Sequence, residues 1–203
     1  MSRAPTLVWQ RDDGLVAARL RPRAPLPPVA VAALLVAGAT LVAVVSTVSG
    51  SAAVVVGLVT VGAGLVRPQE TRAPRTAWMV PPALRTLEYV VAVAAGAAVA
   101  GVGGTAAAFA YVLAVGYHHY DVVYRVRQHG LGPAAAVTAL LGGWELRTAA
   151  VLVAWELGSA AEVLAALSIW CGGIAVVESV ASWRRVSRGA TSPGAEAEEE
   201  IVE

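Results

Sequence analysis

The chain has 203 residues and a formal net charge of +1; 57% of its residues are hydrophobic and 14% are charged. An ordinary soluble domain carries roughly 25% charged residues, so this composition leaves too little polar surface for a soluble globule and predicts an integral membrane protein. All basic residues are arginine, and Cys171 is the one cysteine, which excludes a disulfide within the chain.

Residues 1–28 form a polar lead that carries five arginines and two aspartates and ends in prolines. The segment has no hydrophobic core of its own, so we expect a cytoplasmic arm or linker, with a junction from a longer multidomain protein as the alternative. The first long apolar run begins near Val29 without a clear cleavage site, and a secretory signal peptide is therefore not expected.

Three apolar blocks follow at about 29–66, 85–125 and 145–185. As one helix, each would reach about 60 Å, twice the hydrocarbon thickness of roughly 30 Å. Each block has glycine or serine near its middle, at 46–51, 101–104 and 155–159, and these residues favour turns. The fold class predicted is therefore all-α: a polytopic membrane bundle over residues 29–185, with about six transmembrane helices as three hairpins. Four spans with re-entrant segments are the alternative.

The arginines lie between the predicted outer turns and never in them. They fall in four regions: Arg3, Arg11, Arg19, Arg21 and Arg23; Arg67, Arg72, Arg75 and Arg85; Arg125, Arg127 and Arg147; and Arg184, Arg185 and Arg188. The positive-inside rule then places both termini in the cytoplasm of a protein of the cell (cytoplasmic) membrane. Residues 186–203 are expected to form a disordered acidic cytoplasmic tail.

The residues from Tyr117 to His129 contain all three histidines of the chain. At helical spacing, Tyr117, Asp121, Tyr124, Arg125 and Gln128 share one face. Asp121 and Arg125 are four residues apart and can form an ion pair. The tyrosines fit an aromatic belt at the membrane interface.

The predicted topology brings further polar residues to the same side. We expect a candidate cytoplasmic-face polar cluster that consists of Glu88, His118, Asp121, Tyr124, Arg125, Glu145, Arg147 and Glu178. Carboxylates at membrane depth are costly and face a cavity or a partner. Two interpretations stay open. In the first, the carboxylates and histidine bind a divalent metal while the arginines hold a phosphate or pyrophosphate. In the second, these residues are interfacial anchors, and the acids neutralise nearby arginines.

Residues 82–89 (PALRTLEY), 118–125 (HHYDVVYR) and 142–147 (GGWELR) resemble an uncharacterised actinobacterial integral-membrane domain family. Its members occur alone or fused to nucleotidyltransferase-like or CDP-alcohol phosphatidyltransferase-like regions. The resemblance covers roughly residues 80–160 and implies an inner-membrane protein near phospholipid or phospho-alcohol metabolism, without an established activity.

The CDP-alcohol phosphatidyltransferases themselves have six membrane helices and a DG-xx-AR segment followed by a glycine and two aspartates at four-residue spacing. Here Asp13-Gly14 precedes Ala18-Arg19 with one residue too many between them, and the later aspartates are missing. A complete site of that kind is excluded, while a degenerate relative or an accompanying membrane module stays open.

The leading hypothesis is a multi-pass membrane protein whose cytoplasmic face binds an anionic lipid or a phosphorylated lipid precursor. The alternatives are a membrane-embedded transferase of phospho-alcohol or phospholipid metabolism, which would use Mg or Mn, and a non-catalytic membrane anchor or assembly module. The expected partner is the lipid bilayer, with a homo-oligomer left open. Because the arginines follow membrane topology, no nucleic-acid partner is expected.

Overall fold

The computed structural model describes residues 12–20, 23–24, 26–68, 76–129 and 132–190, and these are almost entirely helical. The helices are α2 (Leu15–Leu20), α3 (Pro28–Ser46), α4 (Gly50–Leu65), η1 (Ala77–Met79), α5 (Val80–Ala97), α6 (Val102–His129), α7 (Ala135–Leu141), α8 (Gly143–Glu156) and α9 (Ala160–Ala190). Two short strands, β1 (Arg23–Ala24) and β2 (Arg67–Pro68), pair in parallel. The predicted all-α class is confirmed.

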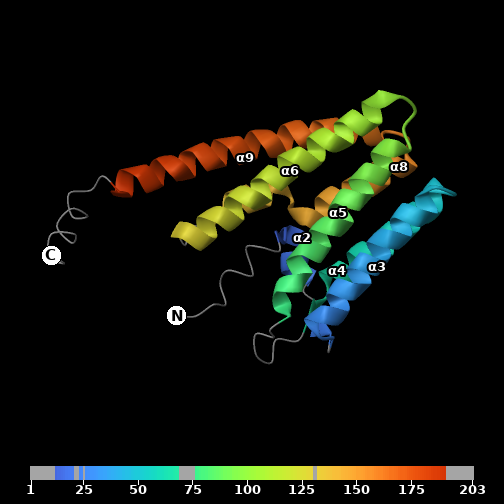
Figure 1. Cartoon of the computed structure of the whole chain (residues 1–203), viewed down its shortest axis with the longest axis horizontal. Helices are drawn as coiled ribbons and strands as arrows, with labels where there is room; N and C mark the ends of the chain where they lie inside the picture. Colours follow the sequence, from blue (N-terminus) through green and yellow to red (C-terminus); the bar gives the residue numbers. More distant parts are fainter. Residues whose placement is uncertain (1–11, 21–22, 25, 69–75, 130–131, 191–203) are drawn as a thin grey trace.

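Three tight turns join α3 to α4, α5 to α6, and α8 to α9, at the positions predicted from the glycine and serine clusters. Ser49 caps α4, since its side chain accepts a hydrogen bond from the Ala52 amide. Gly101 and Gly158 adopt positive φ, which suits glycine at a helix-ending turn. The three turns lie at one end of the bundle (Figure 1), where Ser51 Oγ donates a 3.0 Å hydrogen bond to Glu156.

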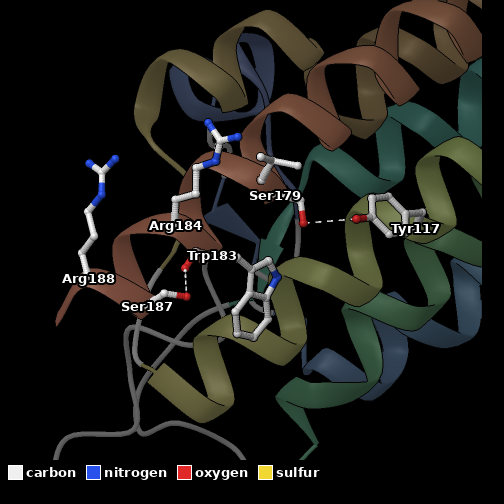
Figure 2. A pocket seen from close by; sticks show the side chains of 7 residues that line it. Tyr117, Ser179, Trp183, Arg184, Ser187 and Arg188 are labelled. Atoms are coloured by element: carbon white, nitrogen blue, oxygen red, sulfur yellow. Dashed lines mark hydrogen bonds between the residues drawn. The ribbon is translucent and has the colours of Figure 1, made fainter. Parts of the chain in front are cut away.

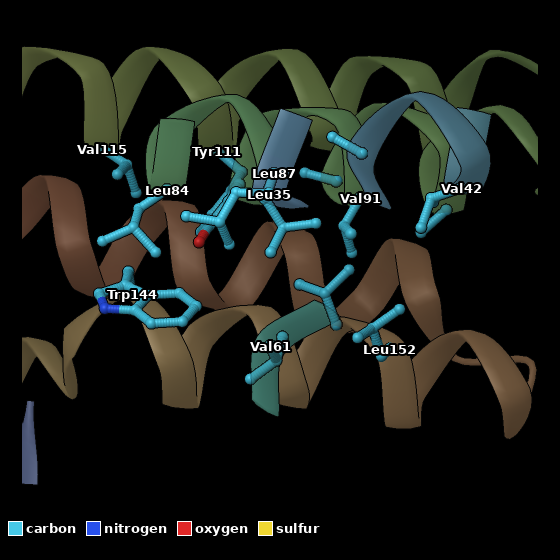
Figure 3. Close-up of a cluster of buried hydrophobic side chains, with 14 of the residues drawn as sticks. Leu35, Val42, Val61, Leu84, Leu87, Val91, Tyr111, Val115, Trp144 and Leu152 are labelled. Atoms are coloured by element: carbon cyan, nitrogen blue, oxygen red, sulfur yellow. The ribbon is translucent and has the colours of Figure 1, made fainter. Parts of the chain in front are cut away.

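The hydrophobic core is centred on α3, α4, α5 and α8 and extends to α6 and α9 (Figure 3). Leu35, Leu87 and Leu152 are fully buried there. Small residues let the helices approach closely, as expected where packing takes the place of the hydrophobic drive. At the α5–α6 contact, a side chain at Gly96 would collide with the backbone carbonyl of Gly104.

The helices α6 and α9 are the longest, with 28 and 31 residues. At 1.5 Å per residue they extend about 42 Å and about 46 Å, which exceeds the roughly 30 Å of a hydrocarbon core. They pack along each other and continue beyond the remaining helices at the end away from the turns (Figure 1). The parts of α6 and α9 that exceed the length of a membrane span are therefore their polar C-terminal ends.

Three helical stretches are long and apolar enough to cross a membrane: Pro28–Ser46, Ala136–Glu156 and Ala160–Arg188. The outward faces of α3 also carry large hydrophobic side chains, since Leu34, Leu41 and Val44 are about half exposed. A helix that is apolar on all sides belongs in a membrane or a large core. These features indicate a membrane protein, whereas six spans and the sidedness of the termini stay predictions.

Two predicted segment boundaries differ from the structure. The arm is not separate from the bundle over Asp12–Leu20, because α2 packs against α8 and Asp12, Gly14 and Ala17 are buried. Helix α9 continues to Ala190, past the expected start of the tail at residue 186. The rest of the predicted tail, 191–203, and the first part of the arm lie outside the described residues.

Candidate functional site

Buried and partly buried polar side chains form two groups, which lie between the middle of the bundle and the end opposite the three turns. We name the first the Arg147 cluster; it consists of Asp12, Glu88, Tyr89, Tyr111, His118, His119 and Arg147. We name the second the Arg125 cluster; it consists of Asp121, Arg125, Glu178, Ser179, Ser182 and Trp183. Helix α6 contributes to both groups: His118 and His119 belong to the Arg147 cluster, and Asp121 and Arg125 belong to the Arg125 cluster.

The guanidinium of Arg147, on α8, binds two carboxylates. Its Nε donates to Glu88 Oε1 at 2.7 Å, and one terminal nitrogen donates to Asp12 Oδ2, also at 2.7 Å. The Tyr111 hydroxyl donates to the same Glu88 oxygen at 2.6 Å. Since all four side chains are buried, the hydrogen bonds and opposite charges offset the cost of desolvation.

The two histidines surround the Asp12 carboxylate. His119 Nε2 lies 3.2 Å from Asp12 Oδ2, and His118 Nε2 lies 3.9 Å from Oδ1. On its other side, His119 Nδ1 shares a 3.1 Å hydrogen bond with the Tyr89 hydroxyl. His118 Nδ1 is buried and has no hydrogen-bond partner among the described residues. The result is a line of hydrogen bonds from α5 through α6 to the N-terminal segment.

Asp12 itself lies outside the apolar helices, at a φ of 53°. Burial raises the pKa of its carboxyl, but the Arg147 guanidinium and the hydrogen bond from His119 outweigh burial and hold that pKa well below its usual range. The carboxylate is therefore charged at neutral pH and serves as a counter-ion inside the bundle.

Glu145 fixes the N-terminal segment from the side of α8. Its two oxygens accept 3.1 Å hydrogen bonds from the amides of Gly14 and Ala17, in the first turn of α2. These amides have no partner within the helix, so a carboxylate there acts as an external cap. Trp144 adds a 3.1 Å hydrogen bond from Nε1 to Asp13.

Two glycines make this close contact sterically feasible. A side chain at Gly14 would collide with the carbonyl of Gly142, and one at Gly143 would collide with the backbone of Gly14. Gly142 and Gly143 also have positive φ, a conformation that suits glycine. The GGWELR segment (residues 142–147) therefore separates α7 from α8 and also forms the surface on which the N-terminal segment packs.

In the Arg125 cluster, a fully buried guanidinium joins α6 to α9. Arg125 Nε donates to Asp121 at 2.8 Å, and its terminal nitrogens bind both oxygens of Glu178. The other Asp121 oxygen accepts hydrogen bonds from Ser179 and Trp183, at 3.1 and 3.2 Å. The predicted i, i+4 ion pair between Asp121 and Arg125 is present, and Glu178 completes it.

An open groove of about 610 Å³ lies beside the Arg125 cluster, along the C-terminal part of α9 (Figure 2). Its lining combines two cationic, two aromatic and two hydroxyl side chains with one valine: Arg184, Arg188, Tyr117, Trp183, Ser179, Ser187 and Val180. The Tyr117 hydroxyl donates to Ser179 at 3.1 Å, which fixes the ring at the edge of the groove. Arg184 and Arg188 are exposed and lie one helical turn apart.

The eight predicted site residues therefore do not share one cleft. Glu88, His118 and Arg147 belong to the first cluster, while Asp121, Arg125 and Glu178 belong to the second. Glu145 caps α2, and Tyr124 contacts the rings of Tyr120 and Trp183 at the surface.

Sequence reasoning missed Asp12, Tyr111, Trp183 and the groove arginines as site residues. Asp12 was detectable as one of only two acids within the arginine-rich arm. Its partner could not be found from spacing, because Arg147 lies far along the chain. Within the described residues, no group of three or more His, Cys, Asp and Glu side chains is placed to hold a metal ion.

A protein-family model described as a family of unknown function (DUF5941) matches residues 8–200, and the chain belongs to that family. The match includes the N-terminal segment from residue 8 onwards together with all the helices. No curated protein and no solved structure matches the chain.

Proposed function

We propose that the protein is a six-span protein of the cytoplasmic membrane with both termini in the cytoplasm, and that the groove beside α9 binds the phosphate headgroup of an anionic lipid. The observation that carries the proposal is the groove itself, in which Arg184 and Arg188 stand next to Trp183 and Tyr117. The actinobacterial source and the link to phospholipid metabolism that the sequence resemblance implies are consistent with this proposal.

The arrangement of charge supports six spans. The helices α5 and α6 carry charged residues, but Glu88, Asp121 and Arg125 are buried and paired inside the bundle. Intramembrane charges are tolerated when they face the bundle interior and pair with one another. Among the described residues, Arg85, Arg127 and Arg184 lie on helix segments away from the turns, on the side that the positive-inside rule assigns to the cytoplasm.

The groove residues have the chemistry of a phosphate site at an interface. Arginine binds phosphate through two parallel hydrogen bonds, which a lysine cannot provide. Aromatic rings such as those of Trp183 and Tyr117 favour the headgroup region, where one end is apolar and the other is wet. The rise along α9 from its first residue, Ala160, to Arg184 is about 36 Å. A span that enters the hydrocarbon core at Ala160 would therefore carry the guanidinium beyond the roughly 30 Å core.

The test is identification of the lipids that remain bound to the purified protein, by mass spectrometry, in three forms of the chain. The wild type is expected to retain phosphate-headed anionic lipids above their share of the host membrane. Arg184→Ala/Arg188→Ala is expected to lose this enrichment. Arg127→Ala removes an exposed arginine at the end of α6 that does not line the groove, and is expected to keep it. Equal lipid content in all three forms contradicts the proposal.

A specific observation favours a second candidate, a non-catalytic assembly module. Most of the predicted polar residues already neutralise one another inside the bundle, so they serve folding irrespective of any ligand. This candidate predicts that the groove double variant changes neither lipid content nor stability. It also predicts that the protein binds a partner protein through the folded bundle, and that this binding is lost when the bundle unfolds.

A further inference from the structure

The groove lined by Tyr117, Trp183, Arg184 and Arg188, which we name the headgroup groove, lies next to an apolar space along the same two helices. An open hollow of about 470 Å³, which we name the α6–α9 cavity, lies between α6 and α9 and is lined by Ala114, Tyr117, Ile169, Gly172 and Val176 among others. Tyr117 lines this cavity and the headgroup groove alike. Small residues form the floor of the space, where Ala114 and Gly172 face each other and a Cβ at Gly172 would lie 3.4 Å from that of Ala114.

The path from the headgroup groove to the far end of the cavity has about the length of one membrane leaflet. From Val180, which lines the headgroup groove, to Ile169, the rise along α9 is about 16 Å. One half of the roughly 30 Å hydrocarbon core has nearly the same thickness. Cationic side chains stand at one end of this path and apolar side chains along the rest of it. The molecule that complements it has an anionic head and an extended hydrocarbon chain.

We propose that the α6–α9 cavity holds one hydrocarbon chain of the same lipid whose phosphate lies between Arg184 and Arg188. This inference rests on the proposed function and adds the ligand class: a phosphate-headed membrane lipid, and not a soluble phosphate. Joining head and chain in one molecule makes the second contact intramolecular, so the lipid binds more tightly than either part alone. Tyr117, at the junction, then contacts the region where head and chain meet.

The chain offers a matched pair of glycines to test the inference. Gly172 lines the cavity, and its Cβ position lies 3.4 Å from Ala114 Cβ, so Gly172→Leu fills the space. Gly173 has nothing within 4 Å of its Cβ position, so Gly173→Leu adds the same bulk on an open face. Val176→Trp is a second blocking variant at a position that is 52% exposed, where a larger ring does not disturb the core.

The probe is phosphatidic acid with a diazirine in the middle of one acyl chain, added to the full-length protein in phosphatidylcholine nanodiscs. After illumination, mass spectrometry locates the cross-linked peptides. The wild type and Gly173→Leu are expected to give cross-links at 110–117 and 168–176. Gly172→Leu and Val176→Trp are expected to reduce them at least fivefold while thermal unfolding shows a folded protein.

The outcomes separate this inference from the proposed function. If both blocking variants cross-link like the wild type while Arg184→Ala/Arg188→Ala loses phosphatidic acid, the headgroup site stands and the chain site is wrong. If the arginine double variant retains phosphatidic acid, the proposed function fails. If water-soluble glycerol phosphate competes as well as phosphatidic acid at equal concentration, the hydrocarbon chain contributes nothing and the inference is overturned.

Discussion

Replacement of Asp12 by asparagine should release the N-terminal segment from the bundle. The substitution keeps the size of the side chain and removes a charge that contacts Arg147 at 2.7 Å and His119 at 3.2 Å. Breaking a buried ion pair costs about 3–5 kcal/mol. Because Glu88 still neutralises Arg147, we expect the lower end, about 3 kcal/mol.

The assay is hydrogen exchange at the amides of Gly14 and Ala17, which donate to Glu145. Since 1.4 kcal/mol corresponds to a factor of ten, a cost near 3 kcal/mol accelerates exchange there by about 100-fold. Asp13→Asn is the control, because asparagine still offers an oxygen to the Trp144 indole; its exchange should change by less than about tenfold. Exchange in Asp12→Asn within twofold of the wild type would refute the role assigned to this carboxylate.

Because the Asp12 carboxylate is charged in the folded protein, the stability of the N-terminal segment should depend on pH. A group whose folded-state pKa is lowered stabilises the folded state above its unfolded pKa, near 4 for aspartate, and loses that contribution as the pH falls towards the folded pKa. Protection of Gly14 and Ala17 should therefore decline below about pH 4 in the wild type. In Asp12→Asn this part of the pH dependence should be absent, and an unchanged profile would contradict the assignment.

Two further substitutions, each with a control variant, test the helix contacts by thermal unfolding in detergent. Glu178→Ala leaves the buried Arg125 guanidinium with one carboxylate and should lower the free energy of unfolding by about 3 kcal/mol. Its control is Glu162→Ala, at an exposed position of the same helix, which should cost well under 1 kcal/mol. Gly96→Ala places a methyl group against the backbone of α6 and should cost about 1–3 kcal/mol, while Gly103→Ala meets open space. Equal stability within either pair would count against the packing described here.

Local rules predicted the three pairs of helices and the turns within them, but not α2 or α7. Block length and the glycine and serine clusters located all three turns, because a helix limited to one membrane thickness must end where turn residues occur. The ion pair between Asp121 and Arg125 was likewise predictable from its i, i+4 spacing. These features depend on residues that are close in sequence.

The polar clusters were not predictable in the same way, because they depend on how distant segments pack. Asp12 meets Arg147 only after the N-terminal segment has folded back onto α8, and nothing in the local sequence encodes that contact. The topology predicted from the sequence places the eight candidate residues on the cytoplasmic side, but it does not divide them into two clusters. In the sequence, the groove arginines indicate only membrane topology, because their place beside Trp183 and Tyr117 depends on how the helices pack.

The central claim, that the groove of a six-span bundle opens on the cytoplasmic side, is tested directly by the labelling of introduced cysteines. The native Cys171 is 1% exposed, so it gives little background. Val48, Val102 and Leu157 are each at least 75% exposed, one at each turn, and Ser187 lines the groove. In intact cells, a membrane-impermeant maleimide should label Val48→Cys, Val102→Cys and Leu157→Cys, and should label Ser187→Cys only after permeabilisation. Labelling of Ser187→Cys in intact cells, or protection of any of the three turns, would contradict the account.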